Sequence, residues 1–354
     1  MEVTREMVTL GVDAHKRTHT VVAVDEPGRE LGQRTIAATS DGHLEALSWA
    51  EQWSQRRWAL EDCAHLTRQL KIDLLVAGES VVKVPPKMMA GVRRSARERG
   101  KSDPIDARAV AQAALREPDL PVARLDGPAR ELRLLVDHRE DLVGERTRIM
   151  SRLRWHLHQL APGQEPPPRS LSRHVVLNEL AIRLATDSRP VARLARSLVE
   201  RLRLLKAEID ALEREIAKLV EDAAPNLRAL SGCGPLTTAK LIGEVGGIGR
   251  FRSRAAFAMH NGTAPVPVWS GNTARFRLNR GGNRQINVAL HRIAITQMQR
   301  PGPAQDYIAR QRSAGKTKLE AIRALRRYIS DEVYRRMVLD AASAVPAAAL
   351  PVAA

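Results

Sequence analysis

The stretch MVTLGVDAHKRTHTVVAVDEPGRELGQRTI, residues 7–36, carries the clearest secondary-structure signal in the chain. Apolar and polar residues alternate from Met7 to Val12, and a second apolar run covers Thr20 to Val24. The tetrapeptide EPGR (residues 26–29) is typical of a tight turn, and Glu30 to Ile36 follows it. This pattern predicts successive short strands joined by turns.

Beyond these strands, the sequence pattern predicts alternating helices and strands as far as residue 122. Apolar spacing at Leu44, Leu47 and Ala50 predicts a helix over 41–56. The remaining expected elements are a strand at Arg57–Leu60, a helix at Ala64–Leu70, and strands at Asp73–Val76 and Val81–Val84. Strands mixed with helices at this pace predict an α/β domain over 1–122.

The chain beyond residue 122 has mainly helical patterns. One long helix is expected over 129–160, followed by a Pro-rich break and a second long helix over about 190–222. The apolar positions of the second helix step by three and four, as in a coiled coil: Leu198, Leu202, Leu205, Ile209, Leu212, Ile216 and Leu219. This seam could pair between chains or pack on the helix at 129–160. We therefore expect a helical coiled-coil region over 123–224.

Two further segments complete the predicted organisation. A small, mainly α domain is expected over 225–337, and the Ala-, Val- and Pro-rich residues 338–354 predict a disordered tail. Cys63 and Cys233 lie far apart and outside any CxxC pair, which argues against a disulfide framework or zinc site and fits a reducing cytoplasm. No apolar run approaches the roughly 18 residues of a membrane span, so no membrane association is expected.

The charge balance indicates a polyanionic partner. Lys and Arg number 57 against 40 Asp and Glu, which gives a formal net charge of +17. Nucleic acid is the first candidate for such a basic protein, although an Arg-rich proteome would produce a similar excess. Aromatic residues make up 3% of the chain. We therefore expect phosphate contacts, not base stacking, to dominate binding, with a steep salt dependence.

Carboxylates occur at positions where they could converge. Asp13 ends the first predicted strand and Glu61 ends the strand after residue 57. Asp103 and Asp106, in KSDPID, share one face of a helix because they are three residues apart. Asp103 before Pro104 is also a good N-cap, with Asp106 at the third helical position as in a capping box. The capping role and a ligand role are compatible.

Taken together, the four acids suit a divalent metal site. Hard cations prefer carboxylate oxygens, and a pair of Mg²⁺ ions can activate a nucleophile and stabilise a leaving oxygen in phosphoryl transfer. The segment that leads into the Asp103–Asp106 pair is basic and could hold a phosphate backbone, or could simply be a solvated charge run. Its cations are Lys83, Lys87, Arg93, Arg94, Arg97, Arg99 and Lys101.

A second candidate site lies between Glu244 and Asp306, where no acidic residue occurs. Arginine guanidinium groups form bidentate hydrogen bonds with phosphate, so this stretch predicts a phosphate-binding face. Its arginines are Arg250, Arg252, Arg254, Arg275, Arg277, Arg280, Arg284, Arg292 and Arg300. Ser270, in PVWSGN, lies within this field and is a candidate nucleophile, although Ser-Gly is also common in turns.

The segment Leu230–Ile242, LSGCGPLTTAKLI, is similar to a helix-hairpin-helix DNA-binding element. Hairpin amides and a helix N-terminus can hold a DNA phosphate, while the alternative is an ordinary tight helix connection. The predicted nucleic-acid-binding set is completed by Lys16, Lys240 and Asn283, beside Lys87, Arg93, Arg94, Arg97, Lys101, Arg275, Arg277, Arg280 and Arg284.

These motifs, in this order, resemble a family of insertion-sequence transposases. The amino-terminal motifs GVDAHK (11–16), Glu61 and KSDPIDA (101–107) resemble its RuvC-like DEDD domain. The elements Leu230–Ile242, Ser270-Gly271 and RGGNR (280–284) resemble its second, transposase domain. The family pattern has a small residue after the strand-end acid, where this chain has Asp62. Glu61 is assigned by its position at the strand end, with Asp62 as the alternative.

The resemblance implies a RuvC/RNase H-like fold, a central coiled coil and a small carboxy-terminal domain. It implies Asp13, Glu61, Asp103 and Asp106 as magnesium ligands and Ser270 as a nucleophile that forms a transient phosphoserine link to DNA. It also implies a homo-oligomer (dimer or tetramer) with a composite centre, a structured element-encoded bridge RNA as guide, donor and target DNA as substrates, and action at the bacterial nucleoid. The alternatives are a Holliday-junction-type metal nuclease and a nucleic-acid-binding protein without catalysis.

Overall fold

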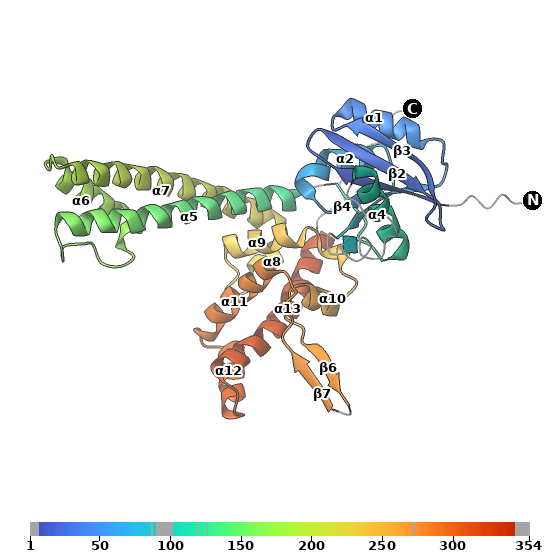
Figure 1. Ribbon diagram of the computed structural model, residues 1–354. Helices are drawn as coiled ribbons and strands as arrows, with labels where there is room; N and C mark the ends of the chain where they lie inside the picture. The colour runs from blue at the N-terminus through green and yellow to red at the C-terminus, as the bar shows by residue number, and fades with distance from the viewer. Residues whose placement is uncertain are drawn as a thin grey trace, which may run out of the picture. The chain divides into compact units, whose positions relative to one another are not determined.

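The computed structural model describes residues 7–85, 88–89, 102–117, 119–125, 127–271 and 273–343. The chain divides into two compact units, Met1–Asp126 and Gly127–Ala354. Figure 1 shows the elements of both units along the chain. Each unit is considered on its own.

The first unit is built on a five-stranded mixed sheet in the order β3-β2-β1-β4-β5. Its strands are β1 (Val8–Ala14), β2 (Thr18–Val24), β3 (Glu30–Ala37), β4 (Arg56–Glu61) and β5 (Val81–Val84). The first three strands are antiparallel neighbours, while β4 pairs in parallel with both β1 and β5. The α/β prediction is confirmed, and this strand order fits the RuvC/RNase H-like fold.

Helices cover both faces of this sheet (Figure 1). Helices α1 (Ser40–Ala50) and α2 (Ala64–Val76) pack on one face, where alternate strand residues such as Leu10 and Val12 are buried. Helix α4 (Asp103–Arg116) packs on the other face. Its buried residues on that side are mostly alanines, so the helix can lie close to the strands.

Two expected elements of this unit differ from the structure. Residues Asp73–Val76 belong to helix α2 and are not a strand. Leu70 and Leu74, one helical turn apart, are both fully buried against the sheet, which holds the segment in the helical period. Helix α1 ends at Ala50 instead of near residue 56.

The second unit begins with a helical arm. Helices α5 (Pro128–Leu160), α6 (His174–Ala185) and α7 (Pro190–Ala223), with the short 3₁₀ turn η1 (Ser170–Ser172), form it. Helices α5 and α7 are antiparallel, because Arg139 pairs with Glu213 (2.5 Å) and Arg201 pairs with Glu145 (2.8 Å).

The seam of α7 is occupied within the chain. Leu202, Leu205 and Ile209 are buried in a core shared with α5 and α6, and Ile216 is buried with α5 and α9. Of the two readings of the seam, packing on the helix at 129–160 is therefore the one that the structure contains.

The rest of the second unit is mainly helical around one core. Its elements are α8 (Pro225–Arg228), α9 (Pro235–Val245), η2 (Ile248–Arg250), α10 (Arg254–His260), β6 (Val266–Ser270), β7 (Thr273–Arg277), α11 (Arg284–Met298), α12 (Pro303–Ser313) and α13 (Lys318–Ser343). Helices α8 to α13 share a hydrophobic core that includes Phe257, Leu290 and Val333. Strands β6 and β7 form a separate two-stranded sheet.

Helix α13 corrects the expected boundary of the terminal tail. It continues to Ser343, so residues 338–343 are helical, and residues 344–354 lie outside the described part of the chain. Asp340 is 8% exposed. Its carboxylate accepts hydrogen bonds from the backbone N–H groups of Asn226 (2.8 Å) and Leu227 (3.0 Å) at the start of α8. This segment therefore closes the core of the second unit.

Among the described helices, none combines the length and apolarity that a membrane crossing requires.

Candidate active site

The sheet brings two of the predicted acids together. Val12 on β1 pairs with Leu60 on the parallel strand β4, so Asp13 and Glu61 follow at adjacent strand ends. Neighbouring strands lie about 4.8 Å apart. Side chains alternate along a strand, and Gly11 and Ala59 face α4, so Asp13 and Glu61 continue on that same face.

Helix α4 brings the other two acids to the same place. A Cβ atom at Gly11 would lie 2.2 Å from the backbone oxygen of Ala107 and 2.5 Å from the backbone nitrogen of Ala111. Only glycine fits this close approach of helix to strand. Gly11, two residues before Asp13, therefore sets the distance between the end of β1 and the beginning of α4.

The start of α4 differs from the expected capping box. The helix begins at Asp103 with Ser102 as its N-cap residue, and the Ser102 side chain makes no cap hydrogen bond. The prediction that Asp103 is the N-cap is wrong, because the backbone turns into the helix one residue earlier. The Asp106 side chain is in the interior (7% exposed), whereas half of the Asp103 side chain is exposed. Both carboxylates lie in the first turn, where the helix dipole stabilises negative charge.

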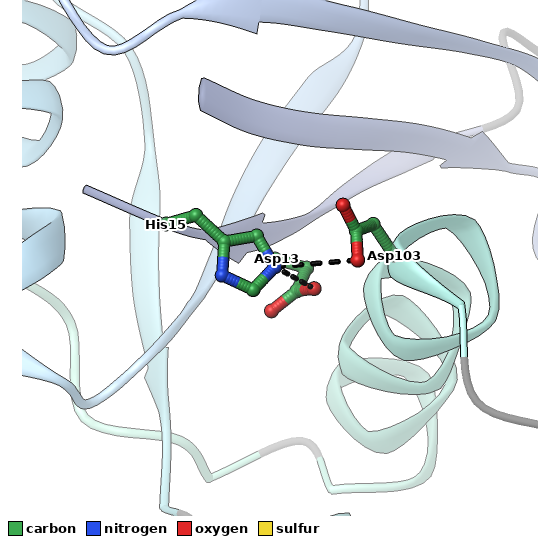
Figure 2. Close-up of side chains that lie close together, drawn as sticks. All are labelled: Asp13, His15 and Asp103. Atoms are coloured by element: carbon green, nitrogen blue, oxygen red, sulfur yellow. Dashed lines mark ion pairs between the residues drawn. The ribbon is translucent and has the colours of Figure 1, made fainter. Parts of the chain in front are cut away.

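His15 links two of the acids (Figure 2). Its Nε2 atom lies 3.2 Å from Oδ2 of Asp13 and 3.3 Å from Oδ1 of Asp103. The donor atoms of these side chains all lie within 4.8 Å of one another, a spacing that could hold a metal ion. The sequence reasoning did not single out His15. Its place at the turn after Asp13, within the GVDAHK motif, is the signal from which it could have been identified.

The electrostatics of Asp13 reflect the crowding of carboxylates. Partial burial raises the pKa of Asp13 above its ordinary value. The charge of His15 opposes this rise, and the negative charges of Asp106, Asp103 and Glu61 add to it. Carboxylates that repel one another in this way are favourable partners for a cation, which would offset the repulsion.

The neighbouring acid, Asp62, has a different environment. Its Oδ1 atom pairs with Nζ of Lys83 at 3.2 Å, and its side chain is 46% exposed. Asp62 is not among the charges that shift the pKa of Asp13, whereas Glu61 is. The geometry therefore favours Glu61 as the member of the acid cluster.

The cations expected around this cluster are only partly described. Lys16 is exposed in the turn between β1 and β2, next to His15. Lys87, Arg93, Arg94, Arg97, Arg99 and Lys101 lie outside the described residues.

Ser270 lies in the second unit, at the end of β6. Its backbone pairs with Thr273 across the loop of the β6–β7 hairpin, and Gly271 in that loop has a φ of +57°, which glycine adopts at little cost. The description of Ser270 is confined to its backbone. On β7, Arg275 and Arg277 pair with Val268 and Val266 and are exposed.

The RGGNR loop (280–284) is held against the end of α10. The backbone N–H of Asn283 donates to the carbonyl of His260 (2.7 Å), and a Cβ atom at Gly282 would lie 2.3 Å from the backbone nitrogen of Gly262. Arg280 and Arg284 are exposed on either side of this tight contact. They remain available to a phosphate backbone.

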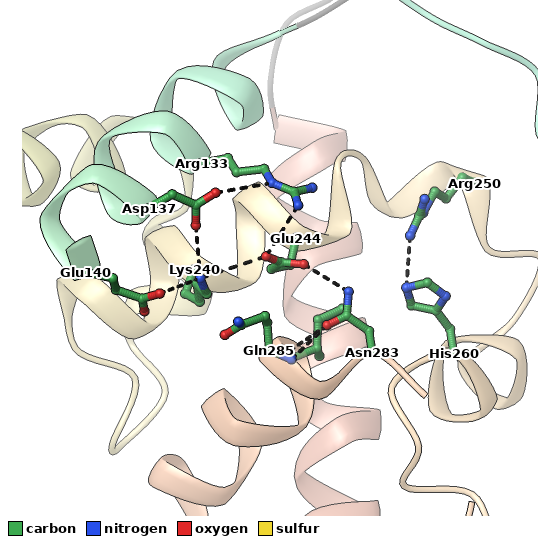
Figure 3. A network of polar contacts seen from close by, with 10 residues as sticks. Arg133, Asp137, Glu140, Lys240, Glu244, Arg250, His260, Asn283 and Gln285 are labelled. Carbon is green, nitrogen blue, oxygen red and sulfur yellow. Dashed lines mark hydrogen bonds and ion pairs between the residues drawn. The ribbon is translucent and has the colours of Figure 1, made fainter. Parts of the chain in front are cut away.

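Lys240 and Asn283 have structural partners (Figure 3). Lys240 is 7% exposed, and its Nζ atom lies 2.9 Å from Glu140 and 3.1 Å from Asp137. Burial alone would lower the pKa of Lys240, but hydrogen bonds to these carboxylates raise it. The prediction that Lys240 contacts nucleic acid is not supported, because α5 encloses its ammonium group.

Asn283 caps helix α11. Its Oδ1 accepts from the backbone N–H groups of Gln285 and Ile286, and its Nδ2 donates to Glu244. All the polar atoms of this side chain are engaged within the protein. The Asn283 side chain therefore holds the start of α11, where Arg284 is the first helical residue. The Leu230–Ile242 segment contains a turn followed by the first part of α9 (Pro235–Val245). Because α8, before the turn, spans only Pro225–Arg228, a helix-hairpin-helix element is not established.

Comparison with known proteins agrees with this arrangement. A model of the IS110 DEDD transposases matches residues 10–162, and a model described as the transposase IS116/IS110/IS902 family matches residues 224–309. Together the two models cover more than half of the chain, in the expected order.

Curated relatives match along most of their length. The chain is 28% identical to the 44.8 kDa protein of insertion element IS116 from Streptomyces clavuligerus, covering 92% of this chain and 94% of the relative. It is 27% identical to the 42 kDa protein of insertion element IS900 from Mycobacterium paratuberculosis, covering 90% and 93%. Among solved structures, RuvC of T. thermophilus in complex with a Holliday junction substrate matches 33% of this chain and 99% of its own, with 13% identity and a TM-score of 0.27. The fold assignment rests on the strand order and not on this last similarity.

The mixed sheet, its acid cluster and the two matching models define a DNA transposase with a DEDD domain. More specifically, the chain belongs to the IS116/IS110/IS902 family of insertion-sequence transposases.

Proposed function

We propose that this transposase cleaves and rejoins the DNA of its insertion sequence with two groups of residues: the acids Asp13, Glu61, Asp103 and Asp106, and the serine Ser270. The observation that carries the proposal is the convergence of the acids. They come from the ends of β1 and β4 and the first turn of α4. Partial burial, and then the negative charges of the other three acids, raise the pKa of Asp13. Such an arrangement is favourable when a cation is bound.

The donor set fits Mg²⁺, which prefers carboxylate oxygen. Asp13, Glu61, Asp103 and Asp106 would hold it, and in a two-metal arrangement it would supply charge stabilisation to the phosphoryl group in transfer. His15 bridges Asp13 and Asp103 at 3.2 and 3.3 Å. It would hold the two carboxylates in register at the site, and Lys16 beside it would contact the DNA backbone.

The proposed covalent step uses the Ser270 hydroxyl. Its oxygen attacks a backbone phosphorus, a P–O ester bond to serine forms, and one P–O bond of the DNA breaks. The serine proton is lost to a base, and the leaving DNA oxygen takes a proton to become a free hydroxyl. A hydroxyl of another strand then attacks the phosphoserine, restores the serine and rejoins the DNA. The exposed arginines Arg275, Arg277, Arg280 and Arg284 bind the phosphates.

The proposed assembly is a homo-oligomer, a dimer or tetramer, in which the acids of one subunit act with the serine of another. We further propose that a structured RNA encoded by the element guides it to donor and target DNA at the bacterial nucleoid. The working division of the chain is a catalytic domain over 1–122, a helical region over 123–224 and a serine-bearing domain over 225–337.

The test is a denaturation-resistant protein–DNA adduct. The full chain is incubated with its element-end DNA, Mg²⁺ and RNA transcribed from the element, and the products are separated on a denaturing gel. An adduct is expected for the wild type and for Ser313→Ala, an exposed serine at the end of α12. No adduct is expected for Ser270→Ala.

Other outcomes have distinct meanings. Cleavage that continues unchanged in Ser270→Ala would show that water is the nucleophile, as in a Holliday-junction-type nuclease. An adduct that forms equally well without the element RNA would remove the guide from the proposal and leave the serine in place.

A further inference from the structure

The β6–β7 hairpin exposes two aromatic side chains on one face. Trp269 is 72% exposed and Phe276 is 69% exposed. The chain has five tryptophans and three phenylalanines. The other phenylalanines, Phe251 and Phe257, pack in the core of the second unit. Two large exposed aromatics on one short hairpin are therefore unusual in this chain and indicate a binding surface.

The strand register places these rings together. Pro267 pairs with Phe276 and Trp269 pairs with Ala274, so Trp269 and Phe276 are diagonal neighbours on the same face. Diagonal neighbours on a hairpin are within reach of one another when they are aromatic. The opposite face carries Arg275 and Arg277, which alternate with Phe276 along β7.

Little packing stabilises the hairpin when its aromatic face is in water. It forms its own two-stranded sheet, and isolated hairpins are marginally stable unless they pack against another surface. Among the described side chains of its strands, Pro267, Trp269 and Phe276 are exposed on one face, and Val266 and Val268 on the other face are only half-buried. A partner that covers the aromatic face would therefore stabilise the hairpin.

We propose that Trp269 and Phe276 form a stacking surface for an unpaired base of the DNA strand beside the phosphate that Ser270 attacks. This inference rests on the proposed function for the position of that phosphate. The occupant is DNA because two features point to it together. Aromatic rings stack on the flat faces of bases. Arg275 and Arg277, on the opposite face of the hairpin, match the charge of a phosphate backbone.

A second copy of the chain is a poorer match for this surface. The segment from Arg250 to Arg300 is acid-free and the chain carries a net charge of +17, so two such hairpins would repel one another. The stack would fix the position of one base of the DNA strand. Phosphate contacts would still supply most of the affinity.

The test compares strands that have bases with strands that lack them. Fluorescence anisotropy measures binding of the full chain, in EDTA, to a labelled oligothymidine of about 16 nucleotides and to an abasic strand of the same length and charge. Trp269→Ala should weaken binding to oligothymidine about tenfold and leave the abasic strand nearly unchanged, because one base–aromatic stack is lost. Phe276→Ala should have the same pattern with a smaller loss, and Trp269→Phe should retain most of the affinity.

The matched control is Trp155→Ala. Trp155 lies on α5 and is 74% exposed, so this variant removes an equally exposed tryptophan away from the hairpin and should bind both strands as the wild type does. Ser270→Ala should also keep the preference for bases. A failure of the serine mechanism would therefore leave this result intact, and a failure of stacking would leave the adduct assay intact.

Several results would overturn the proposal. Equal losses on both strands would mean that Trp269 acts on phosphate binding or on the fold. A change in molecular mass for Trp269→Ala, measured by light scattering, would assign the face to a contact between copies. A loss confined to an oligouridine RNA of the same length would assign it to RNA.

Discussion

The acid cluster and the β6–β7 hairpin are held in place by opposite means. Asp106 is 7% exposed in a helix that lies against the sheet, and Gly11 fixes how closely that helix approaches. The hairpin has exposed residues on both strands, including Trp269 at 72%. The first site is part of a packed core, whereas the second projects from one.

Stability and activity are therefore coupled at the acid cluster and separable at the hairpin. In the first unit, a change that disturbs packing also moves carboxylates, so folding and cleavage should fail together. In the hairpin, substitutions should change nucleic-acid binding and leave the fold intact. The following substitutions test this contrast.

The largest effect is expected at Asp106. Asp106→Asn keeps the size of the buried side chain and removes its charge, so it should reduce strand cleavage on the order of a thousandfold, since metal stabilisation supplies several kcal/mol. DNA binding, measured by gel shift, should remain, because fewer negative charges face the phosphates. Asp62→Asn is the control, and it should cleave normally because Asp62 pairs with Lys83 outside the cluster. Full activity of Asp106→Asn would exclude Asp106 as a ligand.

The next effect is expected at Gly11, which carries no functional group. Gly11→Ala places a methyl group 2.2 Å from the backbone oxygen of Ala107, and the overpacking should destabilise the first unit by about 3 kcal/mol. Hydrogen exchange should rise in β1 and α4, and cleavage should fall with it because Asp13 and Asp106 move apart.

Gly144→Ala is the matched control for that substitution. Gly144 is in the interior of α5, and an added Cβ atom would meet only Nη1 of Arg148 at an ordinary 3.5 Å. Alanine should stabilise the helix by up to about 1 kcal/mol. Unchanged hydrogen exchange in Gly11→Ala would mean that α4 can shift without a loss of stability. The claim that tight packing of α4 on β1 fixes the acid cluster would then be wrong.

The sequence predicted those features of the site that depend on local pattern. Asp13 and Glu61 could be located because strand periodicity identifies β1 and β4, and the ends of parallel neighbours meet. The spacing of Asp103 and Asp106 identified a helix face. The prediction of a strand at Asp73–Val76 was wrong because a short apolar run fits either a strand or a helix. The burial of Leu74 against the sheet favours the helix.

Contacts between distant segments could not be predicted. Lys240 looked like a phosphate contact beside a glycine turn, yet its carboxylate partner Glu140 lies 100 residues earlier in the chain. Asp340 fell within an apparent tail, and its hydrogen bonds to α8 span more than a hundred residues. Such pairings depend on how helices pack, and no local pattern records them.

A smaller effect concerns acid sensitivity of the first unit. His19 on β2 is 2% exposed and stacks on His43, with ring centroids 5.4 Å apart. Burial, and then the charges of His43 and His15, lower the pKa of His19 to about 4. The unfolded chain therefore binds a proton between about pH 6.5 and pH 4 that the folded chain does not, so stability is lost as pH falls through this range.

His19→Leu should remove much of this loss, which amounts to about 2–3 kcal/mol across that range. The difference between the melting temperatures at about pH 7 and about pH 4.5 should be smaller for the variant than for the wild type. His65→Leu, at an exposed position on α2, should keep the wild-type profile. If both variants lose stability as the wild type does, His19 is not the source of acid sensitivity.

The smallest effect is expected at Arg275, and it bears directly on the hairpin. Arg275→Ala should weaken DNA binding severalfold and reduce the slope of log K against log salt by about 0.7–0.9, the loss of one phosphate contact. The melting temperature should not change, because Arg275 is exposed and contributes to no core. Arg189→Ala, an exposed arginine on the helical arm that pairs with Asp187, should leave the salt slope unchanged. An Arg275→Ala variant with a lower melting temperature and an unchanged slope would place this arginine among the residues that hold the fold, and the hairpin would then resemble the acid cluster instead of contrasting with it.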